Sequence, residues 1–388
     1  MIRGGVSSEG SAGGGRRAFV VDKLVGFGSH VLRRLRGLLV LPLIVSVLGT
    51  AAFGTWSQAL SFAAVTSAVA GLSFHLSLVR FTAAAEADRG RVFSTLLVAS
   101  TVLLALVALL LAWAPDPLVK LSIGTLDRRL FAATLALMVL TGQRTLILNL
   151  FRATNRLIQR SVLDLASSTL DLFAIVGALL GGASLLGAML ASVAVNVLTV
   201  IVGLGLAFRV APARIPSLSM LAEAARYGIP LVPATLASWT LDRGDRFVIS
   251  HFLDQHAVGT YSTHYALAAL LGLVLAPIQT TLAPKIVQLW DTDRALSAKY
   301  VAACFRVYWL AWCLFLAVVP TLSVPVLDLF GDATLSEGAF LNVLLISTGV
   351  GMWGLGTIVQ MPLFASKATG SIGATTRRAR PSSPANVP

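Results

Sequence analysis

Residues 93–114 read FSTLLVASTVLLALVALLLAWA, an apolar stretch without a single charged side chain. A bilayer core is about 30 Å thick, and a helix of roughly 20 apolar residues crosses it. Runs of this length recur along the chain, separated by short polar segments. We therefore expect an all-α polytopic membrane protein rather than a soluble protein with an apolar core.

Composition and charge favour the same fold class. Of the 388 residues, 56% are hydrophobic and only 12% are charged, whereas about 25% of the residues in a soluble domain are charged. The net charge is +13, but the cations lie in short clusters between apolar runs rather than in a basic stripe with interleaved aromatics. This pattern predicts contact with membrane lipids and argues against nucleic acid as a partner.

The apolar runs predict about ten transmembrane helices. Their ends are set where polar residues, glycines or prolines interrupt the hydrophobic pattern. The predicted helices are residues 23–48, 55–79, 93–114, 130–151, 162–180, 184–208, 227–252, 258–282, 303–327 and 340–364.

The distribution of Lys and Arg predicts the orientation of these helices. If the N-terminus is cytoplasmic, the segments on the opposite side contain only Lys120, Arg128 and Arg129 as cations, and the remaining inter-helix cations are cytoplasmic. Cytoplasmic loops of membrane proteins are enriched in Lys and Arg. We therefore expect a multi-pass protein of the inner (cytoplasmic) membrane with both termini in the cytoplasm.

An internal repeat organises the predicted helices. Residues 48–57 read LGTAAFGTWS and residues 253–262 read LDQHAVGTYS, an offset of 205 residues (48 to 253). Both copies join an outward-running helix to a returning one, and an even number of helices separates them. This arrangement predicts two lobes related by a parallel repeat, although two small-residue turns could also match by chance.

The repeat and the composition together predict five regions. They are a flexible cytoplasmic N-terminus (1–22), an N-lobe of six helices (23–208), a cytoplasmic linker (209–226), an incomplete second lobe of four helices (227–366) and a disordered cytoplasmic tail (367–388).

Two stretches resemble a known family. Residues 36–81 read RGLLVLPLIVSVLGTAAFGTWSQALSFAAVTSAVAGLSFHLSLVRF, and residues 226–270 read RYGIPLVPATLASWTLDRGDRFVISHFLDQHAVGTYSTHYALAAL. The first is similar to the opening helices, and the second to the seventh and eighth helices, of polysaccharide flippases. These flippases are the O-antigen and exopolysaccharide translocases of the multidrug/oligosaccharidyl-lipid/polysaccharide exporter superfamily.

The resemblance implies a transporter rather than an enzyme. It implies that a lipid-diphosphate-linked oligosaccharide is flipped across the membrane by alternating access during synthesis of lipopolysaccharide or another surface polysaccharide. A polymerase and glycosyltransferases would be partners, no cofactor is required, and H⁺ or Na⁺ could be a coupling ion. Family members have twelve to fourteen helices, so a chain with ten resembles a C-terminally truncated member or, alternatively, a short member completed by a partner or a dimer.

Arginines inside predicted spans are the candidate substrate ligands. Ionisable groups in a membrane usually face a cavity or a partner, and a guanidinium can hold phosphate oxygens bidentately. The related lipid II flippase has arginines in its first helix, and Arg34 is the closest match to them. Alternatively, Arg33 and Arg34 reach the cytoplasmic surface as a basic cluster. The candidates for a diphosphate and sugar cavity are Arg34, Arg33, Arg144, Arg246 and Arg243.

Three aspartates are candidates for coupling or gating. Asp242 and Asp245 lie at helical spacing with Arg246, in a segment that Pro230, Pro233 and Gly244 are expected to interrupt. Broken helices at mid-membrane are typical of transporter sites, but a structural ion pair would give the same spacing. The third candidate, Asp171, shares a polar stripe with Asp164 and Ser168.

Other function classes remain open at this stage. A membrane-bound polysaccharide polymerase or acyltransferase would need an exposed catalytic loop, and the longest outer loop offers only Asp116 and Asp127. A drug/cation antiporter of the same superfamily would favour an acidic, aromatic cavity. An inactive truncated remnant is the fourth possibility. Nucleophile, metal and Walker motifs do not occur in the sequence.

Overall fold

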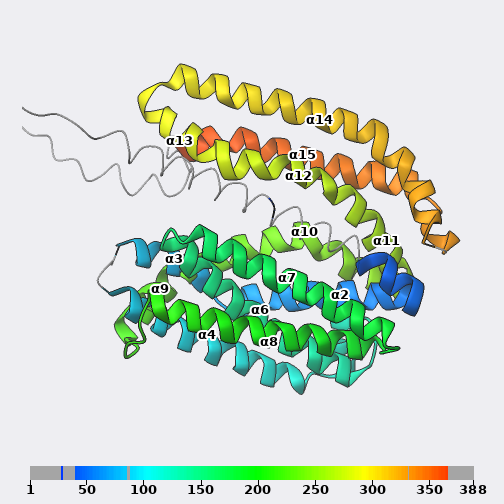
Figure 1. The fold of residues 1–388 in the computed structure, drawn as a ribbon, viewed down its shortest axis with the longest axis horizontal. Helices are drawn as coiled ribbons and strands as arrows, with labels where there is room; N and C mark the ends of the chain where they lie inside the picture. Colours follow the sequence, from blue (N-terminus) through cyan, green and yellow to red (C-terminus); the bar gives the residue numbers. More distant parts are fainter. Residues whose placement is uncertain (1–27, 29–39, 85–87, 331, 366–388) are drawn as a thin grey trace, which may run out of the picture. The chain divides into compact units, whose positions relative to one another are not determined.

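The computed structural model describes residues 28, 40–84, 88–330 and 332–365, and every regular element in them is helical (Figure 1). The predicted all-α membrane architecture is confirmed. Among the described residues, seven helices are long and apolar enough to cross a membrane, or eight if one bent pair forms a single span. The predicted count of ten is not confirmed, and most of the first predicted helix lies outside the described residues.

The chain divides into two compact units. Unit 1 comprises Met1–Ala266 and Val324–Gly338, and unit 2 comprises Leu267–Ser323 and Ala339–Pro388. This division follows packing and does not coincide with the inter-lobe linker predicted at 209–226, because α10 and the start of α11 pack with the helices that precede them. The lobes inferred from the repeat therefore remain a prediction.

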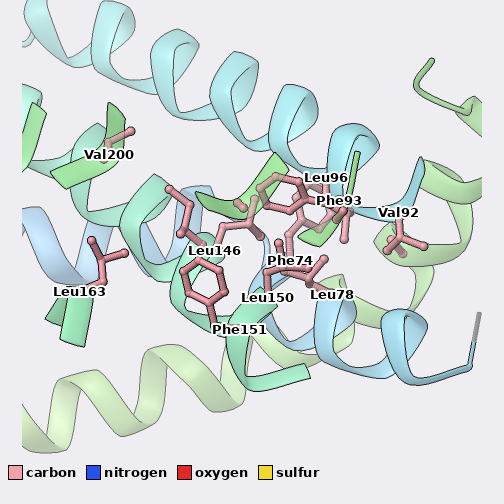
Figure 2. Packing of buried hydrophobic residues seen from close by; sticks show 14 residues of the cluster. Phe74, Leu78, Val92, Phe93, Leu96, Leu146, Leu150, Phe151, Leu163 and Val200 are labelled. Atoms are coloured by element: carbon pink, nitrogen blue, oxygen red, sulfur yellow. The ribbon is translucent and has the colours of Figure 1, made fainter. Parts of the chain in front are cut away.

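Unit 1 is built around one central helix, α6, which packs against α2, α3, α4 and α8. Figure 2 shows the core beside it, where Phe93 of α4 and Leu150 and Phe151 of α6 are fully buried. The helices of this unit are α2 (Thr50–Ala70), α3 (Phe74–Ala84), α4 (Arg89–Ala112), α5 (Asp116–Ile123), α6 (Arg128–Ala153), α7 (Leu157–Leu180), α8 (Leu185–Val210), α9 (Leu218–Gly228), α10 (Val232–Phe252) and most of α11 (Gln255–Ala268).

Unit 2 has its own core between two long helices. Trp312 packs against Gly351 and Tyr308 against Gly354, where an added Cβ would overlap each ring. The indole Nε1 of Trp312 also donates a hydrogen bond to the carbonyl oxygen of Ser347 at 3.1 Å. The main helices of this unit are α12 (Gly272–Pro277), α13 (Ala283–Thr292), most of α14 (Arg294–Asp328) and α15 (Ala339–Ala365).

Short helices occur where loops were expected, and α5 and α9 are two of them. α5 lies in the predicted outer loop, with a proline in its first turn and the left-handed residue Gly124 at its end. α9 lies at the end of the predicted linker, and the Ser217 hydroxyl caps its start by accepting from the Met220 N–H. Both are too short to give a membrane-span pattern, so hydropathy alone did not reveal them.

Three predicted spans are interrupted, and in the eighth the interruption is a 3₁₀ turn at Ala269–Leu271. The second bends by 52° between α2 and α3, where Leu72 and Ser73 adopt positive φ and the Leu72 carbonyl lies against Gly228. The seventh is interrupted by a 3₁₀ turn at Ile229–Leu231, as its prolines predict. The expectation that Gly244 also interrupts it is wrong, because α10 continues through this residue.

We predict that Phe93→Ala destabilises the protein more than Phe173→Ala. Phe93 is fully buried, whereas Phe173 is 65% exposed on α7. Loss of the buried ring leaves a cavity in the core. Outside the core this ring would contact lipid rather than water, so we expect the free energy of unfolding to fall by only about 2 kcal/mol. Thermal unfolding of the purified protein in detergent should show a lower Tm for Phe93→Ala only. Equal shifts for the two variants would contradict this packing.

Candidate functional site

The described part of the chain concentrates opposite charges on α10. Asp242, Arg243, Asp245 and Arg246 lie within about one turn of this helix. α10 consequently does not meet the apolar criterion that the seven candidate spans meet. A helix with this charge density is stable beside the apolar helices only if its ionised groups have partners.

Arg246 is the buried centre of this cluster, with only 7% of its surface exposed. Its Nη1 donates to Asp245 Oδ1 at 3.1 Å and its Nε donates to Ser57 Oγ at 3.1 Å. Nη1 also lies 3.4 Å from the carbonyl oxygen of Asp242. The guanidinium carbon lies 4.6 Å from the centre of the Tyr265 ring. These contacts hold the Arg246 guanidinium of α10 against Ser57 of α2 and Tyr265 of α11.

Tyr261 and Tyr265 of α11 complete the cluster. The Tyr261 hydroxyl donates to the second carboxylate oxygen of Asp245, and the Tyr265 hydroxyl donates to Asp242 Oδ1 at 3.0 Å. Each aspartate therefore has one tyrosine partner as well as a basic neighbour. These tyrosines are not among the predicted site residues, although their i, i+4 spacing was a signal that both rings face one side of α11.

Arg243 is the more accessible cation of the cluster. Its Nε lies 3.3 Å from Asp242 Oδ2, and the two side chains are 35% and 54% exposed, respectively. Its guanidinium carbon lies 5.3 Å from the centre of the Trp239 ring. A charged group held by one exposed partner can exchange that partner for a ligand at low cost.

A second polar cluster connects α6, α7 and α8. Arg144 Nη2 lies 2.7 Å from Asp164 Oδ1, and Ser192 Oγ donates to Asp171 Oδ1 at 2.6 Å. Both aspartates are buried, with 6% and 4% of their surface exposed. Among the described residues, three other buried side-chain atoms here have no hydrogen-bond partner: Gln143 Oε1, Arg144 Nε and Ser168 Oγ.

The structure separates the predicted site residues into these two clusters. Arg243, Arg246, Asp242 and Asp245 lie together on α10, and Arg144 and Asp171 belong to the second cluster. Arg246 pairs with the adjacent Asp245 carboxylate, and it reaches only the backbone carbonyl of Asp242, the residue at i−4. Arg33 and Arg34 lie outside the described residues. The functional roles of all eight residues remain predictions.

Solved structures show which known fold the chain has. It is similar to a lipid II flippase, MurJ, in an inward closed conformation, with a TM-score of 0.71 and 12% identity over 90% of this chain and 77% of that one. It is also similar to a mutant of the Vibrio cholerae MATE transporter VcmN, with a TM-score of 0.63 and 16% identity over 91% of this chain and 84% of that one. At these identities the likeness shows a shared transporter fold.

A third similar structure is an inward-facing multidrug resistance transporter of the MATE family, with a TM-score of 0.60 and 14% identity over 86% of this chain and 83% of that one. No curated protein sequence matches the chain. A family model does match in sequence, over residues 22–290, and its description is polysaccharide biosynthesis protein. This match spans well over half of the chain and includes the α10 cluster. The chain therefore belongs to the polysaccharide biosynthesis protein family.

Proposed function

We propose that this protein flips a lipid-diphosphate-linked oligosaccharide across the inner membrane by alternating access, with both of its termini in the cytoplasm. The surface polysaccharide would be lipopolysaccharide O-antigen or an exopolysaccharide, made together with a polymerase and glycosyltransferases. The observation that carries the proposal is the α10 cluster in a polysaccharide biosynthesis family, because it places an accessible guanidinium beside aromatic rings.

In this proposal the diphosphate is held by arginines. Arg243 would exchange its exposed contact with Asp242 for phosphate oxygens, since charge-assisted hydrogen bonds to phosphate are stronger than neutral ones. Arg246 would contribute positive potential from its buried position while it stays paired with Asp245. Arg33, Arg34 and Arg144 would be further cationic contacts along the path of the diphosphate.

The aspartates would couple transport to an ion. A proton or Na⁺ that binds at Asp242 would weaken the contacts of this carboxylate with Arg243 and Tyr265, while Asp245 would act in gating by holding Arg246 in place. The freed guanidinium of Arg243 could then take a phosphate, which links the two binding events. Asp171, which accepts from Ser192, is proposed as a second coupling residue.

A drug/cation antiporter is the main alternative, since multidrug transporters share the fold. Net charge at the binding site distinguishes the two proposals. An organic cation would be attracted to Asp242 and repelled by Arg243, whereas a diphosphate would respond in the opposite way. Neutral substitutions of Asp242 and of Arg243 therefore test both proposals.

We predict that Arg243→Gln lowers polymer export in a strain whose own polysaccharide flippase is deleted. Loss of a charge-assisted phosphate contact should reduce surface polymer roughly tenfold at matched membrane expression. Arg209→Gln, at an exposed site at the end of α8, is the control and should export normally. If the parent chain exports polymer and Arg243→Gln exports as much, Arg243 does not bind the substrate. If the parent instead confers drug resistance that depends on Asp242, the antiporter proposal replaces this one.

We also predict that Asp245→Asn destabilises the protein more than Asp242→Asn. Asp245 is the ionic partner of the buried Arg246, whose side chain is only 8% exposed, whereas Asp242 is 54% exposed. Leaving a buried guanidinium without its carboxylate should cost about 2 kcal/mol. Thermal unfolding of the purified variants measures the difference.

The double variant Asp245→Asn with Arg246→Met supplies the control for that measurement. It removes both charges together, so it should recover part of the lost stability. If the double variant is less stable than Asp245→Asn alone, the ion pair is not what the single substitution disrupts.

A further inference from the structure

The two copies of the sequence repeat meet in space. Thr50 begins α2 and Gln255 begins α11, and these residues are equivalent under the repeat offset, as are Gly54 and Gly259. A Cβ at Gly54 would overlap the carbonyl oxygen of Gln255, and a Cβ at Gly259 would overlap the carbonyl oxygen of Thr50. Each glycine thus faces the first residue of the opposite helix. This reciprocity is the signature of a local two-fold axis.

A loop from each half of the repeat holds the start of the opposite helix. Gly124, after α5, lies against the Gln255 side chain of the second copy. Asp332, after α14, accepts a hydrogen bond from the Thr50 hydroxyl of the first copy. Hydrogen bonds from the Thr334 and Thr50 hydroxyls hold the pKa of Asp332 below its ordinary value, so this acceptor is ionised at neutral pH. The two loops play matching roles on opposite sides of the crossing.

The same pattern continues one to two turns along each helix. Gln58 Nε2 of α2 donates to the Leu121 carbonyl at 2.7 Å, and His264 Nε2 of α11 lies 2.7 Å from the Leu335 carbonyl. Gln58 also accepts from Gln255 Nε2 at 2.9 Å. Each repeat helix is therefore joined to a short helical segment further along its own half of the repeat, and the two helices are joined to each other.

The crossing is directly connected to the charged cluster. Ser57 lies one turn after Gly54 on α2, and it accepts the hydrogen bond from Arg246 Nε at 3.1 Å. Tyr261, two residues after Gly259, donates to Asp245. Each repeat copy is thus joined to the Arg246–Asp245 pair by one hydrogen bond.

We propose that residues 50–58 and 255–264, together with the segments 121–124 and 332–335, form a two-fold clamp that closes the bundle where α2 and α11 begin and opens to let substrate pass. This role for the repeat rests on the proposed flipping function. Apart from the bond of Thr50 to Asp332, the contacts that join these four segments to one another are made by backbone, glutamine and histidine groups. Such contacts can be exchanged for water when the clamp opens, at a cost of about 1 kcal/mol each.

Static packing is the alternative, because small residues allow close helix contacts in many membrane proteins. The two interpretations predict different access of water to the residues just beyond the point where α2 and α11 cross. Ser61 is fully buried on the same face of α2 as Gly54, about two turns further along the helix. If the clamp opens, a thiol at this position becomes accessible to water. If the packing is static, it does not.

The test uses Ser61→Cys as a reporter in the full chain, with Cys304→Ala and Cys313→Ser to remove the native thiols. The rate of labelling by a membrane-impermeant maleimide is measured from each face in right-side-out and inverted vesicles. Adding Gly54→Ala or Gly259→Ala forces a Cβ into the opposite backbone, which should shift the equilibrium toward the open state. We expect labelling from one face to rise about tenfold, equally for the two variants.

Gly177→Ala on α7 is the matched control, because an added Cβ meets no atom within 4 Å there, and labelling should not change. Thr50→Val is the milder variant if the glycine variants fail to insert. It removes the hydrogen bond to Asp332 at nearly constant volume and should raise labelling about fivefold.

Unchanged labelling in the folded glycine variants, or in Thr50→Val where those fail to insert, would overturn the clamp. This readout needs no substrate, so it is separate from polymer export. If the reporter labels as expected but the parent chain exports no polymer, the clamp stands and the flipping function fails. If the parent exports polymer while labelling never changes, the function stands and the clamp is wrong.

Discussion

The burial of the Arg246 guanidinium is the constraint on which the arrangement of α10, α2 and α11 depends. A guanidinium remains charged at any accessible pH, so it cannot avoid the cost of burial by losing its proton. Its donors require Asp245 on the same helix and Ser57 on α2, and its flat face rests on Tyr265 of α11. The register of α10 against its two neighbours is therefore set by hydrogen-bond geometry as well as by apolar packing.

The same requirement explains why the two polar clusters differ in what they can do. Arg144 is paired with the buried carboxylate of Asp164 at 2.7 Å, and Arg246 is similarly enclosed. Displacing either carboxylate would leave a charge without compensation, which is costly in a medium of low dielectric constant. Arg243 and Asp242 are exposed enough for water to replace either partner. The cluster on α10 therefore combines a fixed cation with an exchangeable one.

Much of the fold could be predicted from hydropathy because a membrane span is a long, uniform signal. The predicted segments 93–114 and 184–208 correspond closely to α4 and α8. The bend between α2 and α3 was not predictable, because Leu72 and Ser73 carry no intrinsic preference for positive φ. Packing of the Gly228 backbone against Leu72 occurs there, and that contact joins residues far apart in the sequence.

The candidate site shows the same division between local and long-range information. The four charged residues of α10 could be grouped from sequence because they are neighbours on one helix. Ser57, Tyr261 and Tyr265 could not be assigned to them, since their contacts depend on how α2 and α11 cross α10. The repeat did contain this information indirectly. Gly54 and Gly259 match in sequence, and the structure shows that they also face each other's helix.

The ion pair of Arg246 and the contacts where α2 and α11 cross are adjacent, but they differ in how much it costs to break them. A joint that must hold in every state can use a buried ion pair, because breaking one is expensive. A joint that must open repeatedly needs contacts whose loss costs little, such as backbone packing against glycine and single neutral hydrogen bonds. The chain places the first kind at Arg246 and the second kind where α2 and α11 cross. Because Ser57 belongs to both sets, the contacts that can open are built directly onto the contacts that stay closed.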